Sequence, residues 1–322
     1  MSFAVDTARI EAAERRLVGV VRETPLLTSP FLDEIAGRRL HVKAECLQHT
    51  GSFKFRGAWS ALSALAPEMR ARGVLAFSSG NHAQGVALAA RRHGCPSVVV
   101  MPKDAPRIKI ENTRALGAEV VLYDRAGGES REEVGAALSA ERGLTLVRPY
   151  DDPEVIAGQA SVGLEIAAQY AGDTAEVLVC CGGGGLSSGI ALALAARAPG
   201  LRLRTVEPAG FDDMARSLRS GVREGNAPAT SICDAILTER PGELTFPILQ
   251  SLAGPGMVVS DAECLRAVAL AAERLQIVLE PGGAAALAAA LFHGEEIAGE
   301  DVIVVATGGN VDAAMFTRAL AA

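Results

Sequence analysis

The sequence predicts an α/β fold in which parallel sheets are covered by helices on both faces. Short apolar runs alternate with longer, alanine-rich stretches of helical period along nearly all of the 322 residues. Polar or glycine-rich segments follow several of these runs, as they do where ligands bind at the carboxyl ends of parallel strands. A chain of this length can bury a large core and is expected to form two domains.

The expected strands and helices alternate through most of the chain. The strands are short apolar runs rich in valine, leucine and isoleucine, at 40–44, 74–78, 97–101, 119–122, 144–147, 176–181, 201–206, 256–259 and 302–306. The helices between them include 81–93, 107–116, 129–142, 153–171, 186–198, 261–275 and 282–292. No internal repeat, low-complexity segment or long linker interrupts this pattern.

Composition argues against two classes of partner. The net charge is −7, and the 31 basic residues form no long run, so nucleic acid is not expected. No stretch reaches the roughly 18 uncharged apolar residues of a membrane span. Residues 1–16 carry acids, unlike a secretory signal, and the six cysteines include no C-x-x-C pair. We therefore expect a soluble, cytoplasmic protein with reduced thiols.

The segment GSFKFRGA (51–58) places Lys54 between two phenylalanines at an expected helix start. Apolar flanks and the positive end of a helix both disfavour the ammonium form and leave a nucleophilic amine. Such a lysine suits a Schiff base with a carbonyl cofactor. The alternative is a lysine whose stem covers apolar surface while its charge stays in water.

The segment SSGNHAQG (78–85) follows the apolar run 74–77 and precedes a helical pattern. Hydroxyls, an amide and the N–H groups of a helix start can together bind an anion such as a carboxylate. A helix cap with nothing bound would explain one serine or asparagine, but not the whole set.

Four consecutive glycines, Gly182 to Gly185, follow an apolar strand and precede a helix. Glycines let backbone N–H groups crowd around a phosphate at a helix start. A dinucleotide fold is the competing interpretation, because Glu207 ends the next strand near the expected position of a ribose-binding acid. The strict G-x-G-x-x-G spacing is absent, however, since Ser187 and Ser188 occupy the place of the third glycine.

The segment TGGN (307–310) follows the last expected strand. A hydroxyl at that strand end can face a heterocyclic nitrogen, although such a segment by itself is usually a turn.

In this order, GSFKFRGA, SSGNHAQG, GGGGL and TGGN resemble the fold-type II pyridoxal-phosphate enzymes, which are tryptophan synthase β-like, and specifically their threonine/serine dehydratase and serine racemase branch. Further matches are RPYDDP at 148–153, VIAGQ at 155–159, VEP at 206–208 with Asp212-Asp213, and Glu280-Pro281. The resemblance covers nearly the whole chain. It implies a large cofactor domain of residues 1–67 plus 149–322, a small domain of residues 68–148, and a homodimer.

The resemblance also implies roles around pyridoxal 5'-phosphate. Lys54 would anchor the cofactor and act as the general base, and Phe53 would pack against its ring. Asn81 would bond its phenolic oxygen, and Thr307 would face its pyridine nitrogen. The phosphate would be held by Gly182, Gly183, Gly184, Gly185 and Leu186. A neutral hydroxyl opposite the nitrogen makes the ring a weaker electron sink, which favours β-elimination.

Substrate recognition is implied for the second loop. Ser78, Asn81 and His82 would bind the substrate carboxylate, with Ser79 on the cofactor face opposite Lys54, where the matching serine of racemases delivers a second proton. Arg131 resembles an arginine that reaches the site from the small domain; the alternative is a solvated helix charge.

Glu207, the Phe211 carbonyl and Asp213 match the family's divalent-cation site, an oxygen-rich set suited to Mg²⁺, Mn²⁺ or Ca²⁺. The alternative is a pair of acids at a helix start.

The resemblance implies a dehydratase that converts L-threonine or L-serine to a 2-oxo acid and ammonia. Departures from the usual pattern at 160–161, Ala235 and Arg148 weaken the assignment to threonine itself. An additional arginine would suit a second carboxylate, so 3-hydroxyaspartate dehydratase is an alternative, as is serine racemase. A catalytically silent regulator on the same fold is a further alternative, although the retained Lys54 argues against it.

Overall fold

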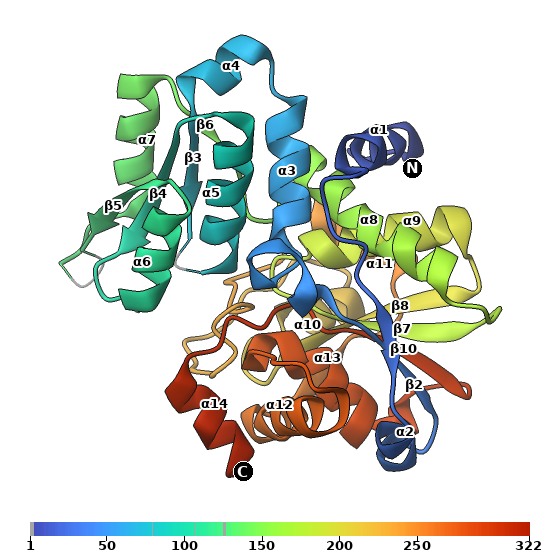
Figure 1. Ribbon diagram of the computed structural model, residues 1–322. Helices are drawn as coiled ribbons and strands as arrows, with labels where there is room; N and C mark the ends of the chain where they lie inside the picture. The colour runs from blue at the N-terminus through green and yellow to red at the C-terminus, as the bar shows by residue number, and fades with distance from the viewer. Residues whose placement is uncertain (1–2, 79, 106, 125–126) are drawn as a thin grey trace.

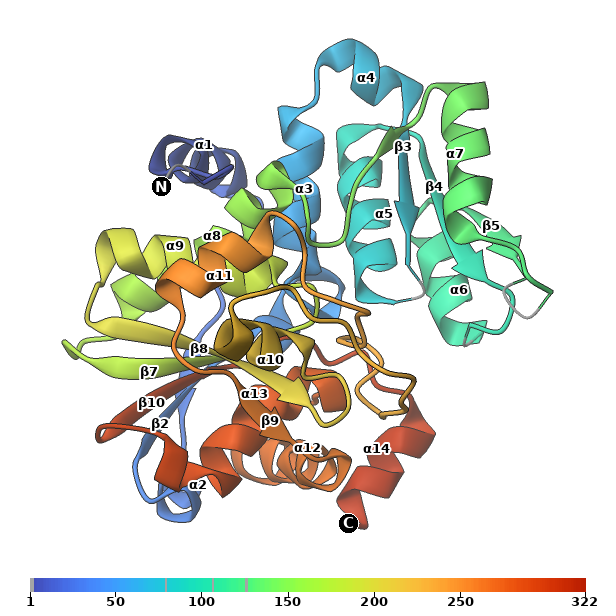
Figure 2. The ribbon, with the colours of Figure 1, turned by 180° about the vertical axis from the view of Figure 1, so that it is seen from behind.

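The protein contains two sheets, each with helices on both faces, in a computed structural model that describes residues 3–78, 80–105, 107–124 and 127–322 (Figure 1). Figure 2 shows the same arrangement from behind, with the smaller sheet and its helices above and beside the larger unit. The α/β class with two parallel sheets is therefore confirmed.

The larger sheet has six strands in the order β1-β2-β10-β7-β8-β9. Every neighbouring pair is parallel except β1 and β2. The strands are β1 (Leu26–Thr28), β2 (Arg39–Lys43), β7 (Ala175–Cys180), β8 (Leu201–Pro208), β9 (Met257–Val259) and β10 (Asp301–Val305). The sequence pattern missed β1, because three residues after a proline are too few to show an alternating pattern.

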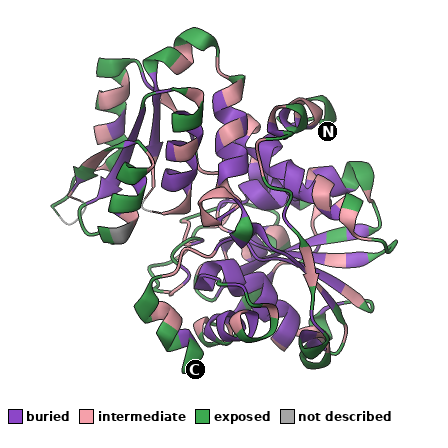
Figure 3. Ribbon diagram, viewed as in Figure 1, coloured by how far each residue is buried: buried purple, intermediate pink, exposed green. Residues whose placement is uncertain are grey.

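Alternate residues of the larger sheet face two different helix layers, as the pleat requires. Val302 and Val304 pack in the core under α2 (Pro30–Ala36), α12 (Asp261–Leu275) and α13 (Pro281–Phe292). Ile303 and Val305 pack on the opposite face, under α8 (Pro153–Gln169) and α9 (Gly185–Arg197). Figure 3 shows these central strands and α13 almost wholly buried.

The smaller sheet has four parallel strands in the order β5-β4-β3-β6. They are β3 (Val74–Phe77), β4 (Ser97–Pro102), β5 (Glu119–Tyr123) and β6 (Thr145–Leu146). The helices α5 (Asn81–His93) and α6 (Arg107–Ala115) cover one face, and α7 (Arg131–Arg142) covers the other. All four strands lie inside the expected small domain, whose exact boundaries remain a prediction.

The remaining helices connect or flank these layers. They are α1 (Thr7–Leu17), α3 (Lys54–Ala64), α4 (Pro67–Arg72), α10 (Asp213–Ser220), α11 (Thr245–Leu252) and α14 (Ala313–Leu320), with 3-10 turns at Glu45–Leu47, His49–Gly51 and Gly294–Glu296. None of the helices in the described ranges is long and apolar enough to cross a membrane.

Candidate active site

Backbone contacts bring the first and last motifs together at the carboxyl end of the larger sheet. Ser52 and Gly308 form an antiparallel bridge. The Phe53 N–H donates to the Thr307 carbonyl at 3.2 Å, and the Gly309 N–H donates to the Gly51 carbonyl at 2.9 Å. Lys54, the first residue of α3, therefore lies beside the strand end that carries Thr307.

Two asparagines connect the second motif to the same place. Asn310 Nδ2 donates to the Thr50 carbonyl at 2.8 Å and to Asn81 Oδ1 at 2.7 Å. Gly85 allows α5 to approach, since a Cβ there would lie 3.1 Å from the Lys54 backbone. Segments separated by more than 200 residues in sequence thus converge around Lys54.

The Lys54 amine is withdrawn from water and has a shifted pKa. Its Nζ donates to the Pro149 carbonyl at 2.9 Å and lies 5.0 Å from the centre of the Phe53 ring. Removal from water lowers the pKa of Lys54 to about 8, and the nearby Glu280 opposes that shift. The neutral, nucleophilic form of this amine is therefore far more populated near neutral pH than in an ordinary lysine, as the apolar flanks in the sequence indicated.

Glu280 is a site residue to which the sequence analysis assigned no role. Its carboxyl group is buried and accepts a hydrogen bond from Asn81 Nδ2. Burial raises the pKa of Glu280 to about 7, with Asn81 acting in the opposite direction. A Cβ on Gly308 would lie 2.1 Å from this carboxylate, so glycine at position 308 leaves room for the Glu280 side chain. The pair Glu280-Pro281 was the available signal.

His82 is buried and neutral. Its Nε2 lies 2.9 Å from the Val147 carbonyl and must donate to it. Burial, and then the charge of Lys54, lower the pKa of His82 to about 3. A ring in this tautomer presents only an acceptor at Nδ1, so its predicted contact with a substrate carboxylate gains no support from the geometry.

The glycine loop fits a phosphate group. Gly184 has φ +92°, and a Cβ on Gly183 would lie 2.3 Å from the Tyr150 ring. Within the described ranges, the N–H groups from Gly183 to Ser187 meet no hydrogen-bond acceptor at the start of α9. Leu186 offers only its backbone, since its side chain is in the core. Backbone N–H groups without a protein acceptor at a helix start are well suited to bind a phosphate.

Two buried hydroxyls lie beside this loop and were missed by the sequence analysis. Neither Ser187 Oγ nor Thr238 Oγ1 makes a hydrogen bond to any residue the structure describes. The Thr238 methyl group is 3.3 Å from where a Cβ of Gly182 would be. Both are available to a bound oxyanion. Thr307 is also buried, and its hydroxyl lies 3.1 Å from Cys180 Sγ, so no ionised group meets it there.

The geometry gives less support to the other predicted substrate residues that the structure describes. Ser79 is outside the described residues, and Ser78 Oγ accepts from the Gly80 N–H at 3.1 Å. Arg131 is exposed at the start of α7 and pairs with Glu132 at 2.7 Å. Arg148 is exposed as well. Neither arginine makes a hydrogen bond or ion pair with Lys54 or with the described part of the 78–81 loop.

The proposed cation ligands are buried together. Glu207 accepts from the N–H groups of Met214 and Ala215, at 2.9 and 2.7 Å, as an acid at the start of α10 would. Asp213 accepts from Asn226 Nδ2 at 2.6 Å, while its Oδ2 is buried without a partner among the described residues. Burial raises the pKa of Asp213 to about 6 and that of Glu207 well above its usual value. The unpartnered oxygen fits a cation.

A buried ionic network holds the start of α3. The Arg56 guanidinium makes bidentate contacts with Glu45 and with Glu165, and Lys43 Nζ also contacts Glu165. Arg56 and Lys43 are wholly buried. Their charges are balanced by the two carboxylates, so the network fixes α3, and hence Lys54, without leaving an uncompensated charge.

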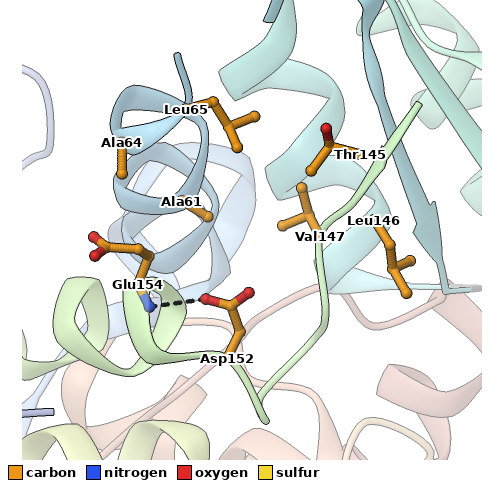
Figure 4. A pocket seen from close by; sticks show the side chains of 8 residues that line it. All are labelled: Ala61, Ala64, Leu65, Thr145, Leu146, Val147, Asp152 and Glu154. Atoms are coloured by element: carbon orange, nitrogen blue, oxygen red, sulfur yellow. Dashed lines mark hydrogen bonds between the residues drawn. The ribbon is translucent and has the colours of Figure 1, made fainter. Parts of the chain in front are cut away.

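A separate cavity of about 190 Å³ lies between α3 and the segment that returns from the smaller sheet. Figure 4 shows its lining, which is Ala61, Ala64, Leu65, Thr145, Leu146, Val147, Asp152 and Glu154. None of the predicted site residues is among them.

Comparison with known proteins defines the class. The family model described as "Pyridoxal-phosphate dependent enzyme" matches residues 18–308, so the chain belongs to that family. A Pseudomonas protein named L-threo-3-hydroxyaspartate ammonia-lyase is 44% identical over 94% of this chain and 94% of its own length. Membership favours a phosphate cradle at Gly182–Gly185 over the dinucleotide site considered above.

Solved structures place the chain within one branch. The crystal structure of a threonine deaminase from T.th. is 44% identical, with a TM-score of 0.89 and coverage of 95% of this chain and 99% of that one. Maize serine racemase is 35% identical, with a TM-score of 0.91 and coverage of 99% and 98%. The chain is thus a fold-type II enzyme of the threonine/serine dehydratase and serine racemase branch.

Proposed function

We propose that the protein is an ammonia-lyase that removes water from a β-hydroxy amino acid of the L-threonine or L-serine type, giving a 2-oxo acid and ammonia. The observation that carries this proposal is the Lys54 amine, which is withdrawn from water next to the SSGNHAQG and TGGN motifs and has a pKa lowered to about 8. When bound, pyridoxal phosphate supplies an electron-withdrawing ring that acidifies the α-hydrogen of the attached amino acid.

The other steps of the reaction are assigned to residues of the chain. The neutral Lys54 amine first holds the cofactor and then removes the α-proton as a general base. The N–H groups of Gly183 to Ser187, with the Ser187 and Thr238 hydroxyls, hold the phosphate. Ser78, Asn81 and the start of α5 receive the substrate carboxylate. The β-hydroxyl leaves as water, and the unsaturated amine that is released hydrolyses to the 2-oxo acid and ammonia.

The neutral environment of Thr307 supports elimination. Its hydroxyl meets the Cys180 thiol and, among the residues that the structure describes, no carboxylate. Such a group does not hold a pyridine nitrogen protonated as an aspartate would, so electron withdrawal is moderate. Moderate withdrawal suits the rapid departure of a β-substituent better than chemistry through a long-lived carbanion.

The Lys54→Ala variant tests the proposal. We expect it to fold but to lose both the visible absorbance of the lysine-bound cofactor and the release of ammonia from L-threonine and L-serine. Lys103→Ala, on the surface, is the control and should keep both. Undiminished ammonia release by Lys54→Ala would contradict the proposal. A wild-type protein that binds amino acids without turnover would instead indicate a silent regulator.

Serine racemisation is the second candidate, and it depends on Ser79. Ser79→Ala should keep most dehydration of an L-substrate, whose proton leaves on the Lys54 side, and should lose interconversion of L- and D-serine.

A divalent cation at Glu207, Phe211 and Asp213 belongs to the proposal, with the unpartnered Asp213 Oδ2 as its support. The homodimer and the cytoplasmic location remain predictions.

A further inference from the structure

An ion pair joins the two units beside Gly80. Lys109 Nζ, on α6 of the smaller unit, lies 2.6 Å from Asp234 Oδ2, on the long segment between α10 and α11. Figures 1 and 2 both show α6 next to this segment. The Lys109 side chain is 16% exposed, whereas that of Asp234 is 58% exposed. The cation is thus sheltered, and its partner is free to move into water.

Lys109 also faces the substrate loop. Its Nζ lies 3.9 Å from the position of a Cβ on Gly80, between Ser78 and Asn81. Its charge reaches the buried Glu280, whose pKa it lowers together with Lys54, while Asp234 raises it. Lys109 is therefore a cation within electrostatic reach of the groups assigned to the substrate.

The arginines suggested by the sequence for a second carboxylate are placed less well. Arg131 is 53% exposed and already pairs with the adjacent Glu132, and Arg148 is exposed. An exposed cation binds a carboxylate weakly because water competes and salt screens the attraction. A sheltered ammonium such as that of Lys109 binds one more strongly.

We propose that Lys109 determines substrate specificity by binding the distal carboxylate of a dicarboxylic β-hydroxy amino acid, such as 3-hydroxyaspartate. In the free enzyme Asp234 neutralises Lys109, and it swings into water when the substrate carboxylate takes its place. This inference rests on the proposed ammonia-lyase function. The elimination then yields oxaloacetate and ammonia, with water leaving Cβ and returning on hydrolysis.

Because Asp234 and the substrate carboxylate compete for Lys109, substitutions of Lys109 and of Asp234 should have opposite effects on kcat/KM for the dicarboxylic substrate. Lys109→Met removes the cation, so kcat/KM for L-threo-3-hydroxyaspartate should fall roughly ten- to a hundredfold relative to L-serine, as for the loss of a charged hydrogen bond. Asp234→Asn removes the competing carboxylate, so the same ratio should rise. Lys109→Arg keeps the charge and should retain most of the preference. Arg107→Met, on the exposed face of the same helix, is the matched control.

Binding of non-reacting acids to the holoenzyme gives a readout besides turnover. Succinate should raise the melting temperature more than butyrate does, and Lys109→Met should abolish the difference. Equal losses on both substrates in Lys109→Met and Asp234→Asn would show a structural latch between the units and overturn the inference. Turnover of L-serine or L-threonine but not of hydroxyaspartate would overturn it alone, whereas no turnover of any of them would contradict the proposed function itself.

Discussion

At the scale of single residues, burial sets the chemistry of the site in two opposite directions. Desolvation lowers the pKa of Lys54 to about 8 and raises that of Glu280 to about 7. Both shifts favour the neutral form, so near neutral pH the neutral amine is more populated than in an ordinary lysine and the carboxyl is partly protonated. The neutral amine is the form that Schiff-base chemistry with a carbonyl cofactor requires.

The Glu280→Gln substitution should change how stability depends on pH. The folded-state pKa of Glu280, about 7, is raised above its ordinary 4.5, so the folded state binds the proton more tightly and stability falls as pH rises between these values. The loss is on the order of 3 kcal/mol. An amide does not titrate, so the variant should lack this decline. Urea unfolding of cofactor-free protein at pH 4 to 8 measures it, and parallel curves for the two proteins would contradict the assignment.

The sequence was sufficient for Lys54 but not for Glu280. The two phenylalanines that flank Lys54 indicate an apolar environment for its amine, because residues adjacent in sequence are also close in space. Glu280 acquires its raised pKa from burial, and its hydrogen-bond partner Asn81, which opposes that shift, is 199 residues away in the chain. Only the fold creates that environment, and the same is true of the buried hydroxyls of Ser187 and Thr238.

At the scale of elements, the glycine loop between β7 and α9 shows backbone geometry serving binding. Gly184 adopts φ +92°, which side-chain-bearing residues rarely do, and this turn directs the following N–H groups to one side. The run of four glycines predicted this loop. Its contact with Tyr150 could not be predicted, because it depends on how segments that are distant in sequence pack within the larger unit.

Gly184→Ala should weaken cofactor binding beyond the cost of backbone strain. A Cβ there would meet Thr245 Oγ1 at 2.9 Å and displace the loop. Loss of one hydrogen bond to the phosphate corresponds to an affinity roughly tenfold lower. Gly94→Ala is the matched control, since Gly94 has φ +64° and open space around it. Backbone strain should cost both variants about 1 kcal/mol of stability, and Gly184→Ala should lose more because of its contact with Thr245. Equal cofactor affinities by titration would contradict the phosphate role.

The order of elements could largely be read from the sequence. Each expected strand coincides with an observed one to within a few residues, because buried parallel strands are continuous apolar runs. The start of α7 differs slightly from the expectation. Ser130 caps this helix by accepting from the Glu133 N–H at 3.3 Å, so it begins at Arg131 rather than at 129.

At the scale of the whole molecule, the site exists only because two units meet. The larger sheet supplies the glycine loop and Thr307, the smaller one supplies the loop from Ser78, and α3 runs between them from Lys54. Sequence patterns specify each unit, but not their relative placement, which depends on contacts such as Lys109 with Asp234. The resemblance to a family provided what the patterns could not.

Stability of the whole fold is the quantity that tests the cation at Glu207 and Asp213. Two buried carboxylates repel each other, and Asp213 Oδ2 meets no partner among the described residues, so a bound divalent ion should stabilise the folded state. At a hundredfold excess over the dissociation constant the gain is about 3 kcal/mol. A chelator should therefore lower the melting temperature, and Mg²⁺ or Mn²⁺ should restore it.

Asp213→Asn is the sharper test of that site. It should abolish the response of the melting temperature to chelator and metal while leaving cofactor bound to Lys54. Asp212→Asn, at the neighbouring position where the side chain pairs with Arg216, is the control and should respond as the wild type does. If chelator leaves the wild-type melting temperature unchanged and metal analysis detects no divalent ion, the two acids serve only the start of α10. The N–H groups of Met214 and Ala215 would then be the sole partners that Glu207 needs.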